Sequence, residues 1–440
     1  MSEGVPTAAD PGQQPQPSSQ ILEMQGADSG QPISPSPTPR PKTRAKWPTA
    51  LLVVIAFIVI LSVAYLLLPS RPSTTASTTA STTALPTTNT TAFQRNSGKV
   101  FVESQSLVYV VNEQNQSILG YVNFTRPGAR DIGVSAISPN GTYIYTTIID
   151  YGLAVAGAST FHIIKGIPLQ QQKTLFTSGV VNVSPSGRYI FVSSPSGNDT
   201  FMINSSTYSV QKTIPLGASP AMALMDYKTG ILYIGNWNHK ITEINASNGS
   251  IIRTTARLNA AITALGISTN GTYLYAGQSY PKNNITIIST TTGDIVGSLP
   301  MPGIPDYIEN DSAYIYASTY PNAFGSGEVA MINSTTNKII SEFDQYPSTT
   351  MSIDAANNRI YLGNSNYDKL IILNATDLKL VSTVNNTGPI SSLAISPDGK
   401  YLYAIILPNY TVSVINTTSM GIIAKLPIST PAYGIYFPSK

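Results

Sequence analysis

Short runs of alternating apolar and polar residues follow one another from residue 96 to the C-terminus, and turn residues bound each run. The clearest copy of this pattern spans residues 394–428 and divides into four runs of four to seven residues, rich in β-branched and aromatic side chains. Runs of this length and composition predict β-strands. A Pro-Asp-Gly turn separates the first two runs, and Gly399 supplies the backbone freedom that a tight turn favours. The copy therefore predicts a unit of four short strands.

The same unit recurs along the chain at a spacing of 41–46 residues. After the first turn, each copy has an aliphatic residue followed by an aromatic residue at a fixed position. These aromatic residues are Tyr145, Phe191, Tyr233, Tyr275, Tyr316, Tyr361 and Tyr403. A period in this range with four strands per unit is typical of the blades of a β-propeller. The sequence thus predicts an all-β fold, a β-propeller of four-stranded blades.

The two ends of the repeat region complement one another. The first copy begins with the second strand, residues 99–102, and continues with a third and a fourth strand at 107–112 and 117–124. Residues 431–438 read as a first strand with nothing after it. We predict that this C-terminal strand completes the first blade and closes the ring, which removes long exposed edges. Counting copies predicts eight blades, or seven if the divergent copy around residues 150–175 does not form a full blade.

The motifs carry a resemblance to a known repeat family. Ser-Pro-Asp-Gly-Lys-Tyr-Leu-Tyr at 396–403 and Thr-Val-Ser-Val-Ile-Asn-Thr-Thr at 411–418 resemble the YVTN-type β-propeller repeats of archaeal and bacterial surface proteins. The resemblance covers residues 99–438 and implies a propeller, a fold that hosts many functions. The copies at 226–230, 310–313 and 355–358 depart from it, because they lack the Pro-Asp-Gly turn.

The chain before the repeats divides into three segments. Residues 1–46 are rich in Pro, Gln, Ser and Gly and predict a disordered tail with a basic end. Residues 47–69 contain nineteen uncharged residues in succession, which give about 28 Å of helix, close to the thickness of the bilayer hydrocarbon. We predict a single transmembrane α-helix there, whose partner is the lipid bilayer. Residues 70–95 are a Ser/Thr-rich stalk, and residues 96–440 form the propeller.

Basic residues flank the predicted helix mainly on its N-terminal side, at Arg40, Lys42, Arg44 and Lys46. This asymmetry predicts a single-pass protein of the cell membrane, with a cytoplasmic N-terminus and an extracellular propeller. The alternative is a cleaved signal peptide, whose apolar core is normally shorter and whose leader is shorter as well.

The amino-acid composition disfavours several classes of binding and catalytic site. The chain has 25 Lys and Arg against 22 Asp and Glu, so it offers no basic field for nucleic acid. It has no cysteine and two histidines, His162 and His239, which disfavours thiolate sites, His-based triads and multi-His metal sites. We expect no catalytic residue, no metal and no cofactor.

Asn-X-Ser/Thr sequons are frequent after the predicted helix, and none precedes it. They predict N-glycosylation of the ectodomain. The alternative is that turn chemistry alone favours Asn-Gly-Thr and Asn-Thr-Thr. The sequon asparagines are Asn89, Asn115, Asn123, Asn140, Asn182, Asn198, Asn204, Asn245, Asn248, Asn270, Asn284, Asn310, Asn333, Asn374, Asn385, Asn409 and Asn416.

The connections between second and third strands repeatedly carry an aromatic residue, in two cases beside asparagines. Aromatic faces beside amide donors favour a rim that binds sugars or peptides. The alternative is that the rings cover the ends of the blades. The candidate rim residues are Tyr151, Asn236, Trp237, Asn238, Tyr280, Tyr320, Asn364, Tyr367 and Tyr410.

Two functions remain open from the sequence. The first is a non-catalytic, N-glycosylated surface protein for envelope structure, adhesion or ligand recognition, with glycans or other surface proteins as partners. The second is a propeller hydrolase of the lactonase or glycan-cleaving type, which needs clustered carboxylates or a metal at the central channel.

Overall fold

The computed structural model describes residues 98–125, 132–169, 179–279, 281–311, 313–320, 327–346, 348 and 350–438. The predicted tail, transmembrane helix and stalk lie outside these residues. Within the part of the chain that the structure describes, no helix is long and apolar enough to cross a membrane.

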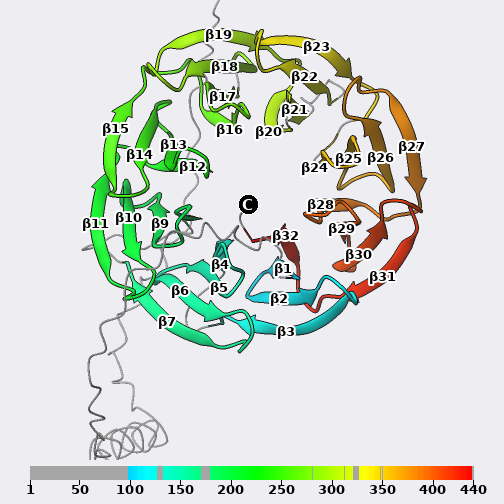
Figure 1. The fold of residues 1–440 in the computed structure, drawn as a ribbon, viewed down its shortest axis with the longest axis horizontal. Helices are drawn as coiled ribbons and strands as arrows, with labels where there is room; N and C mark the ends of the chain where they lie inside the picture. Colours follow the sequence, from blue (N-terminus) through cyan, green and yellow to red (C-terminus); the bar gives the residue numbers. More distant parts are fainter. Residues whose placement is uncertain are drawn as a thin grey trace, which may run out of the picture. The chain divides into compact units, whose positions relative to one another are not determined.

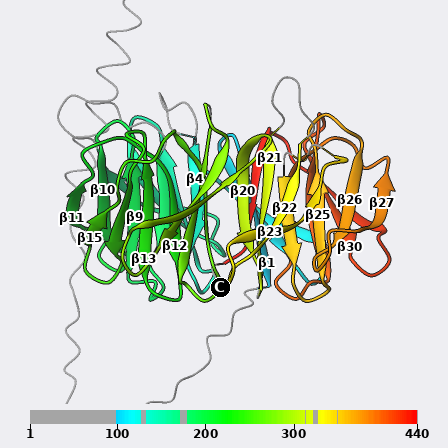
Figure 2. The same cartoon turned by 90° about the horizontal axis from the view of Figure 1, so that it is seen from above.

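The described residues form eight four-stranded antiparallel sheets arranged as blades around a central axis (Figure 1). In each blade the first strand lies at the axis and the fourth at the circumference, and Figure 2 shows the blades side by side from the edge. Blade 1 consists of β32 (Ala432–Tyr436), β1 (Lys99–Ser104), β2 (Leu107–Asn112) and β3 (Ser117–Asn123).

The other seven blades each use four consecutive strands. Blades 2 to 4 consist of β4 (Ile132–Ile137), β5 (Tyr143–Ile148), β6 (Gly152–Gly157), β7 (Ile163–Pro168); β8 (Val180–Val183), β9 (Tyr189–Ser194), β10 (Asp199–Asn204), β11 (Val210–Pro215); and β12 (Pro220–Asp226), β13 (Ile231–Asn236), β14 (Ile241–Asn245), β15 (Ser250–Thr254).

Blades 5 to 8 follow the same order. They consist of β16 (Ile262–Ile267), β17 (Tyr273–Gln278), β18 (Asn284–Ser289), β19 (Ile295–Pro300); β20 (Ile304–Asn310), β21 (Tyr314–Tyr320), β22 (Val329–Asn333), β23 (Lys338–Phe343); β24 (Thr350–Asp354), β25 (Arg359–Gly363), β26 (Lys369–Asn374), β27 (Leu380–Asn385); and β28 (Ile390–Ile395), β29 (Tyr401–Ile406), β30 (Thr411–Asn416), β31 (Ile422–Pro427).

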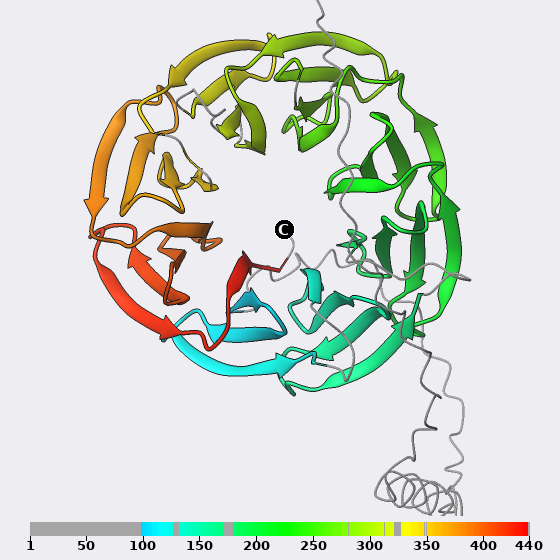
Figure 3. The ribbon, with the colours of Figure 1, turned by 180° about the vertical axis from the view of Figure 1, so that it is seen from behind.

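The ring is closed by the C-terminal strand, as the sequence predicts. β32 pairs antiparallel with β1, with Val102 opposite Ile435, and completes blade 1 from the axis side (Figure 3). The divergent copy forms a complete blade, β4 to β7, so the prediction of eight blades is confirmed and the alternative of seven is wrong.

The hydrophobic core is a ring of eight clusters, each between two neighbouring blades. Second and third strands are buried on both faces because each blade packs against two others, so they read as nearly continuous apolar runs. Every cluster contains one aromatic residue from the fixed position of a second strand, and blade 1 supplies Phe101 there.

Several of these tyrosines also link neighbouring blades by hydrogen bonds. The Tyr275 hydroxyl of blade 5 donates to Asn337 Oδ1 of blade 6 at 2.6 Å. The Tyr403 hydroxyl of blade 8 donates to Gln116 Oε1 of blade 1 at 2.8 Å, across the closure of the ring. The recurring aromatic residue therefore fixes one blade against the next.

In the turn between first and second strands, a side-chain oxygen accepts a hydrogen bond from a backbone N–H group. In four blades the Oγ of a serine accepts the backbone N–H five residues later, at 2.9–3.0 Å; the serines are Ser138, Ser184, Ser268 and Ser396. In the three copies that lack the Pro-Asp-Gly turn, a carboxylate of Asp226, Asp311 or Asp354 accepts backbone N–H groups instead. These blades keep four strands because a different acceptor closes the same turn.

The turn between third and fourth strands, hereafter the outer turn, has one conformation in all eight blades. One residue has a φ between 55° and 81°, and its N–H donates to the carbonyl four residues earlier. A register shift follows in each strand pair, as in hairpins that combine a type I turn with a bulge. The residues with positive φ are Gln116, Phe161, Tyr208, Gly249, Gly293, Asn337, Leu378 and Met420.

Candidate functional site

The rim residues that the structure describes lie at the ends of second strands or in the connections to the third strands, and they differ in exposure. Trp237, Tyr320 and Tyr367 are 62%, 49% and 45% exposed, and Asn238 is exposed beside Trp237. Tyr320 and Tyr367 belong to the neighbouring blades 6 and 7, whereas Trp237 belongs to blade 4. These four side chains are available to a partner without forming one continuous aromatic surface.

The other rim residues have structural roles. Asn236 is buried and its Nδ2 donates to Thr242 Oγ1 at 3.0 Å. Asn364 is buried and its Oδ1 accepts the Asn366 N–H at 2.7 Å. Each amide thus makes a hydrogen bond within its own blade.

Two rim tyrosines cover the ends of their blades. The Tyr151 ring packs against the blade 1–blade 2 core and lies over Gly166, and Tyr410 packs against the blade 8–blade 1 core. For these two the alternative of blade packing describes the structure. Tyr280 lies outside the described residues, as does the sequon Asn89.

A hollow of about 600 Å³ lies at the axis of the ring, where the first strands of blades 4 to 8 end. We call it the channel-mouth pocket. Because adjacent strands are antiparallel, the connections that carry the rim aromatics are at the opposite end of the blades. Its apolar wall consists of Leu224, Ile267, Ile308, Ile353 and Ile395.

Charged groups stand at the edge of the channel-mouth pocket. Glu309 and Asp226 line it, together with Lys228, whose Nζ donates to the Thr269 carbonyl at 3.2 Å. The Asp226 carboxylate accepts the Lys228 N–H at 2.9 Å and a hydrogen bond from the Thr229 hydroxyl. The pocket therefore combines aliphatic walls with a few charged groups, the usual chemistry of a small-ligand site.

The sequence-based prediction of the rim missed this pocket. Its signal is an isoleucine directly before the turn residue of several copies, as at Ile267, Ile353 and Ile395. One isoleucine at the end of a strand has the pattern of an ordinary core residue. Only the ring brings these three positions, together with Leu224 and Ile308, around one space.

Glu103 is the most strongly perturbed carboxyl near the axis. It lies in β1, is 4% exposed, and its Oε2 accepts the Ser135 N–H of blade 2 at 3.2 Å. Burial raises the pKa of Glu103 to about 7, against the weaker opposing effect of hydrogen bonds with Tyr436 and Ser135. The carboxyl therefore stays largely protonated in mildly acidic solution, and its partners Ser135 and Tyr436 belong to two strands, β4 and β32.

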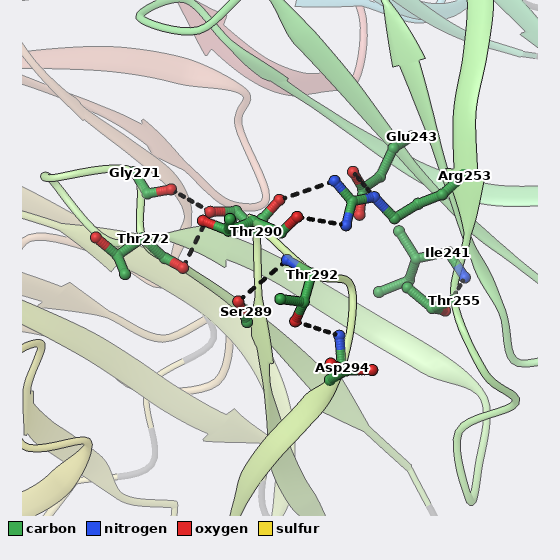
Figure 4. A network of polar contacts seen from close by, with 11 residues as sticks. Ile241, Glu243, Arg253, Thr255, Gly271, Thr272, Ser289, Thr290, Thr292 and Asp294 are labelled. Carbon is green, nitrogen blue, oxygen red and sulfur yellow. Dashed lines mark hydrogen bonds and ion pairs between the residues drawn. The ribbon is translucent and has the colours of Figure 1, made fainter.

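A second buried carboxylate serves the packing of blades 4 and 5. Glu243 is fully buried and pairs with Arg253, with 3.1 Å between Oε2 and Nε (Figure 4). The guanidinium also donates to the carbonyls of Thr291 and Thr290 in blade 5, at 2.8 and 3.2 Å. The pair lies on the third and fourth strands of blade 4, away from the axis, and its role is structural.

Metal-ligating groups do not gather in the described part of the chain: no three His, Cys, Asp or Glu side chains there are placed to hold an ion. Of the acidic residues described above, Glu103 belongs to blade 1, Glu309 to blade 6, and Asp226 and Glu243 to different strands of blade 4.

No family model matches the chain. Over 226 residues it is 23% identical to the uncharacterized protein YwhL of Bacillus subtilis, a match that covers 50% of this chain and 38% of that protein. The chain thus spans well under half the length of this curated relative.

Several solved structures superimpose on most of the chain. Dihydro-heme d1 dehydrogenase NirN, solved in complex with DHE, gives a TM-score of 0.66 at 14% identity, over 80% of this chain and 78% of that chain. The computationally designed Ika8 protein gives 0.58 at 10% identity, over 72% of this chain and 93% of the designed one. A chain of the mitotic checkpoint complex gives 0.52 at 13% identity, covering 77% and 98%. At these identities the likeness shows the fold alone.

Proposed function

We propose that this protein is a non-catalytic recognition protein displayed at the cell surface, and that its ligand binds in the channel-mouth pocket. The observation that carries the proposal is the pocket itself, whose volume of about 600 Å³ suits a small ligand. Five blades each contribute an aliphatic side chain to one wall, so closure of the ring preorganises the site.

The residues that line the channel-mouth pocket indicate which class of ligand it binds. Aliphatic side chains favour an apolar body, and Glu309 at the edge favours a cationic or hydroxyl-bearing group beside it. A short peptide with an aliphatic side chain and a basic group, or an amphipathic glycan derivative, meets both requirements. The exposed Trp237, Tyr320 and Tyr367 form a second, weaker candidate surface at the other end of the blades.

A membrane-anchored display is supported by the sequence. The nineteen uncharged residues within 47–69, the basic residues before them and the Ser/Thr-rich stalk after them are the features of a single-pass surface protein. The YVTN-like repeat motifs favour the same setting. We therefore place the propeller outside the cell, with N-glycans at a part of its sequons.

The binding test is a screen of short peptides and oligosaccharides against the propeller, residues 89–440, whose eight core clusters all lie within it. We expect Ile395→Arg, which places a charge in the pocket wall, to weaken binding by about tenfold or more. The matched control is Ile423→Arg, the same change at a half-exposed position on the circumference. Equal affinity of both variants, or no ligand for the unmodified protein, would refute the pocket as the site.

The hydrolase remains the alternative because of one observation, the buried Glu103 with its raised pKa of about 7 beside Tyr436. A carboxyl of this kind is suited to general acid chemistry. Turnover of sugars and lactones by the propeller, abolished in Glu103→Gln, would favour the hydrolase over the recognition protein. Turnover retained in that variant would remove Glu103 from consideration.

A further inference from the structure

The asparagines that begin five of the outer turns share one hydrogen-bonding arrangement. Their Oδ1 atoms accept the N–H two residues later, at 2.8–3.0 Å, and in three turns also the N–H three residues later. Within the described residues their Nδ2 atoms donate to no partner, and the side chains are half-buried. The five are Asn204, Asn245, Asn333, Asn374 and Asn416, and each belongs to a sequon.

Three other sequon asparagines have their Nδ2 engaged or buried. Asn284 is 7% exposed, and its Nδ2 donates to Thr286 Oγ1 and Ser298 Oγ at 3.2 and 2.8 Å. Asn310 Nδ2 donates to the Ile267 carbonyl of blade 5 at 2.6 Å. Asn182 Nδ2 is buried within the protein. A group attached to Asn182 or Asn284 would displace strands, and one attached to Asn310 would compete with the hydrogen bond of its nitrogen to blade 5.

Exposed aliphatic residues lie directly beside the five outer turns. The residue before each of these asparagines pairs with the first aliphatic residue of the fourth strand, as Leu373 does with Leu380 and Ile415 with Ile422. Paired residues lie about 5 Å apart. We call the exposed aliphatic residues at the start of these fourth strands the aliphatic collar, and they are 38–53% exposed: Val210, Ile251, Ile252, Ile340, Leu380, Val381, Ile422 and Ile423.

We propose that N-glycans attach to Asn204, Asn245, Asn333, Asn374 and Asn416 and lie over the aliphatic collar, while Asn182, Asn284 and Asn310 stay unmodified. This rests on the extracellular placement in the proposed function. Two observations support it. The Nδ2 atoms of the five asparagines donate to no partner within the described residues. The residue before each asparagine pairs with the fourth strand that carries the aliphatic collar.

The modification leaves the outer turns intact. The Nδ2 atom forms a bond with C1 of the glycan and loses one proton, and the C1–O bond to a lipid-linked phosphate donor breaks, with the phosphate leaving with the electron pair. Oδ1 keeps its backbone hydrogen bonds, because the product is still an amide. The attached sugar supplies hydration over aliphatic side chains that are otherwise exposed on each blade.

The first experiment measures occupancy by glycopeptide mass spectrometry on the full chain purified from the membranes of the organism that makes it. We expect glycans on the five outer-turn asparagines and none on Asn182, Asn284 or Asn310. A glycan on any of these three in folded protein, or bare asparagines at all five turns, would overturn the assignment.

The second experiment tests whether the glycans shield the aliphatic collar from solvent. The variant Thr335→Ala, Thr376→Ala, Thr418→Ala removes three sequons but keeps their asparagines and the backbone N–H groups that bond to them. The matched control carries serine at the same three positions, which preserves the sequons. We expect an apolar dye to bind the alanine variant about twofold more than the serine control, because the collar is exposed.

The outcomes separate this inference from the proposed function. Equal dye binding by the two variants would show that the glycans do not lie over the aliphatic collar, even if the glycans are present. Ligand binding in the channel-mouth pocket should be the same in both, since the pocket is at the axis and the collar at the circumference. Loss of ligand binding therefore bears on the proposed function alone.

Discussion

Replacing Glu103 with glutamine should make the propeller more stable in neutral and alkaline solution and leave it unchanged in acid. The folded protein holds the pKa of this buried carboxyl at about 7, whereas an ordinary glutamate has 4.5. Between these values the folded state keeps a proton that the unfolded chain has lost. Stability therefore falls as the pH rises from about 4.5 to about 7, and the loss from this group is complete above that.

The size of the effect follows from the shift in pKa. The pKa of Glu103 is about 7 in the folded protein and 4.5 in an ordinary glutamate. Each pKa unit corresponds to about 1.4 kcal/mol, so the ionised carboxyl lowers the free energy of unfolding by roughly 3 kcal/mol at pH 8. Glutamine has the same shape, bears no charge, and its oxygen can still accept the Ser135 N–H. The variant should gain the full amount at pH 8 and differ from the parent by only a few tenths of a kcal/mol at pH 4.

The assay is urea unfolding of parent and variant propellers at a series of pH values between 4 and 8. Glu328 also has a pKa of about 7, raised mainly by burial and then by Glu342, and it contributes equally to both proteins. The difference between the two curves isolates Glu103. A difference that does not change with pH, or a variant less stable than the parent at pH 8, would refute the reasoning.

Three further changes test how the blades are held together, each measured by urea unfolding. Tyr403→Phe removes the hydrogen bond to Gln116 across the closure of the ring and should cost about 1 kcal/mol; no loss would mean that the bond contributes nothing. Arg253→Met leaves the buried Glu243 without its counter-ion and should cost about 3 kcal/mol, most of which Glu243→Gln in the same chain should restore. Gly293→Ala should cost about 1–2 kcal/mol, because φ is 81° and the added Cβ would lie 2.7 Å from Arg253 Cδ; an unchanged midpoint would contradict this.

The fold was predictable because its signals are local and repeated. A turn, an aromatic residue at a fixed position and alternating runs recur at 41–46 residues, and each copy specifies the same four strands. The missing first strand before Lys99 and the extra strand at Ala432–Tyr436 predicted the closure of the ring. Even the copies without Pro-Asp-Gly keep the turn, since Asp226 can accept the backbone N–H as a serine does elsewhere.

The candidate site was predictable only in part, because exposure depends on neighbouring blades. Asn236 and Asn238 are two residues apart in one connection, yet the first is buried against Thr242 and the second is exposed. Likewise, the sequence does not show that the nitrogen of Asn284 is bonded whereas that of Asn374 is free. The channel-mouth pocket is formed by the ends of five first strands that are far apart in the sequence. The repeat period predicts that these strands form a ring. It does not predict the volume of the space between them.

The position of β1 within its blade determines how the ring responds to force. The described chain begins at Gly98 and enters β1 at once, and β1 lies between β2 and β32 rather than at an edge. A pull transmitted through the preceding chain therefore loads two rows of backbone hydrogen bonds, five residue pairs to β2 and four to β32. When the pull acts along β1, both rows must shear together, whereas an edge strand has one row of hydrogen bonds to break. The strand that closes the ring thus also acts as its mechanical clamp.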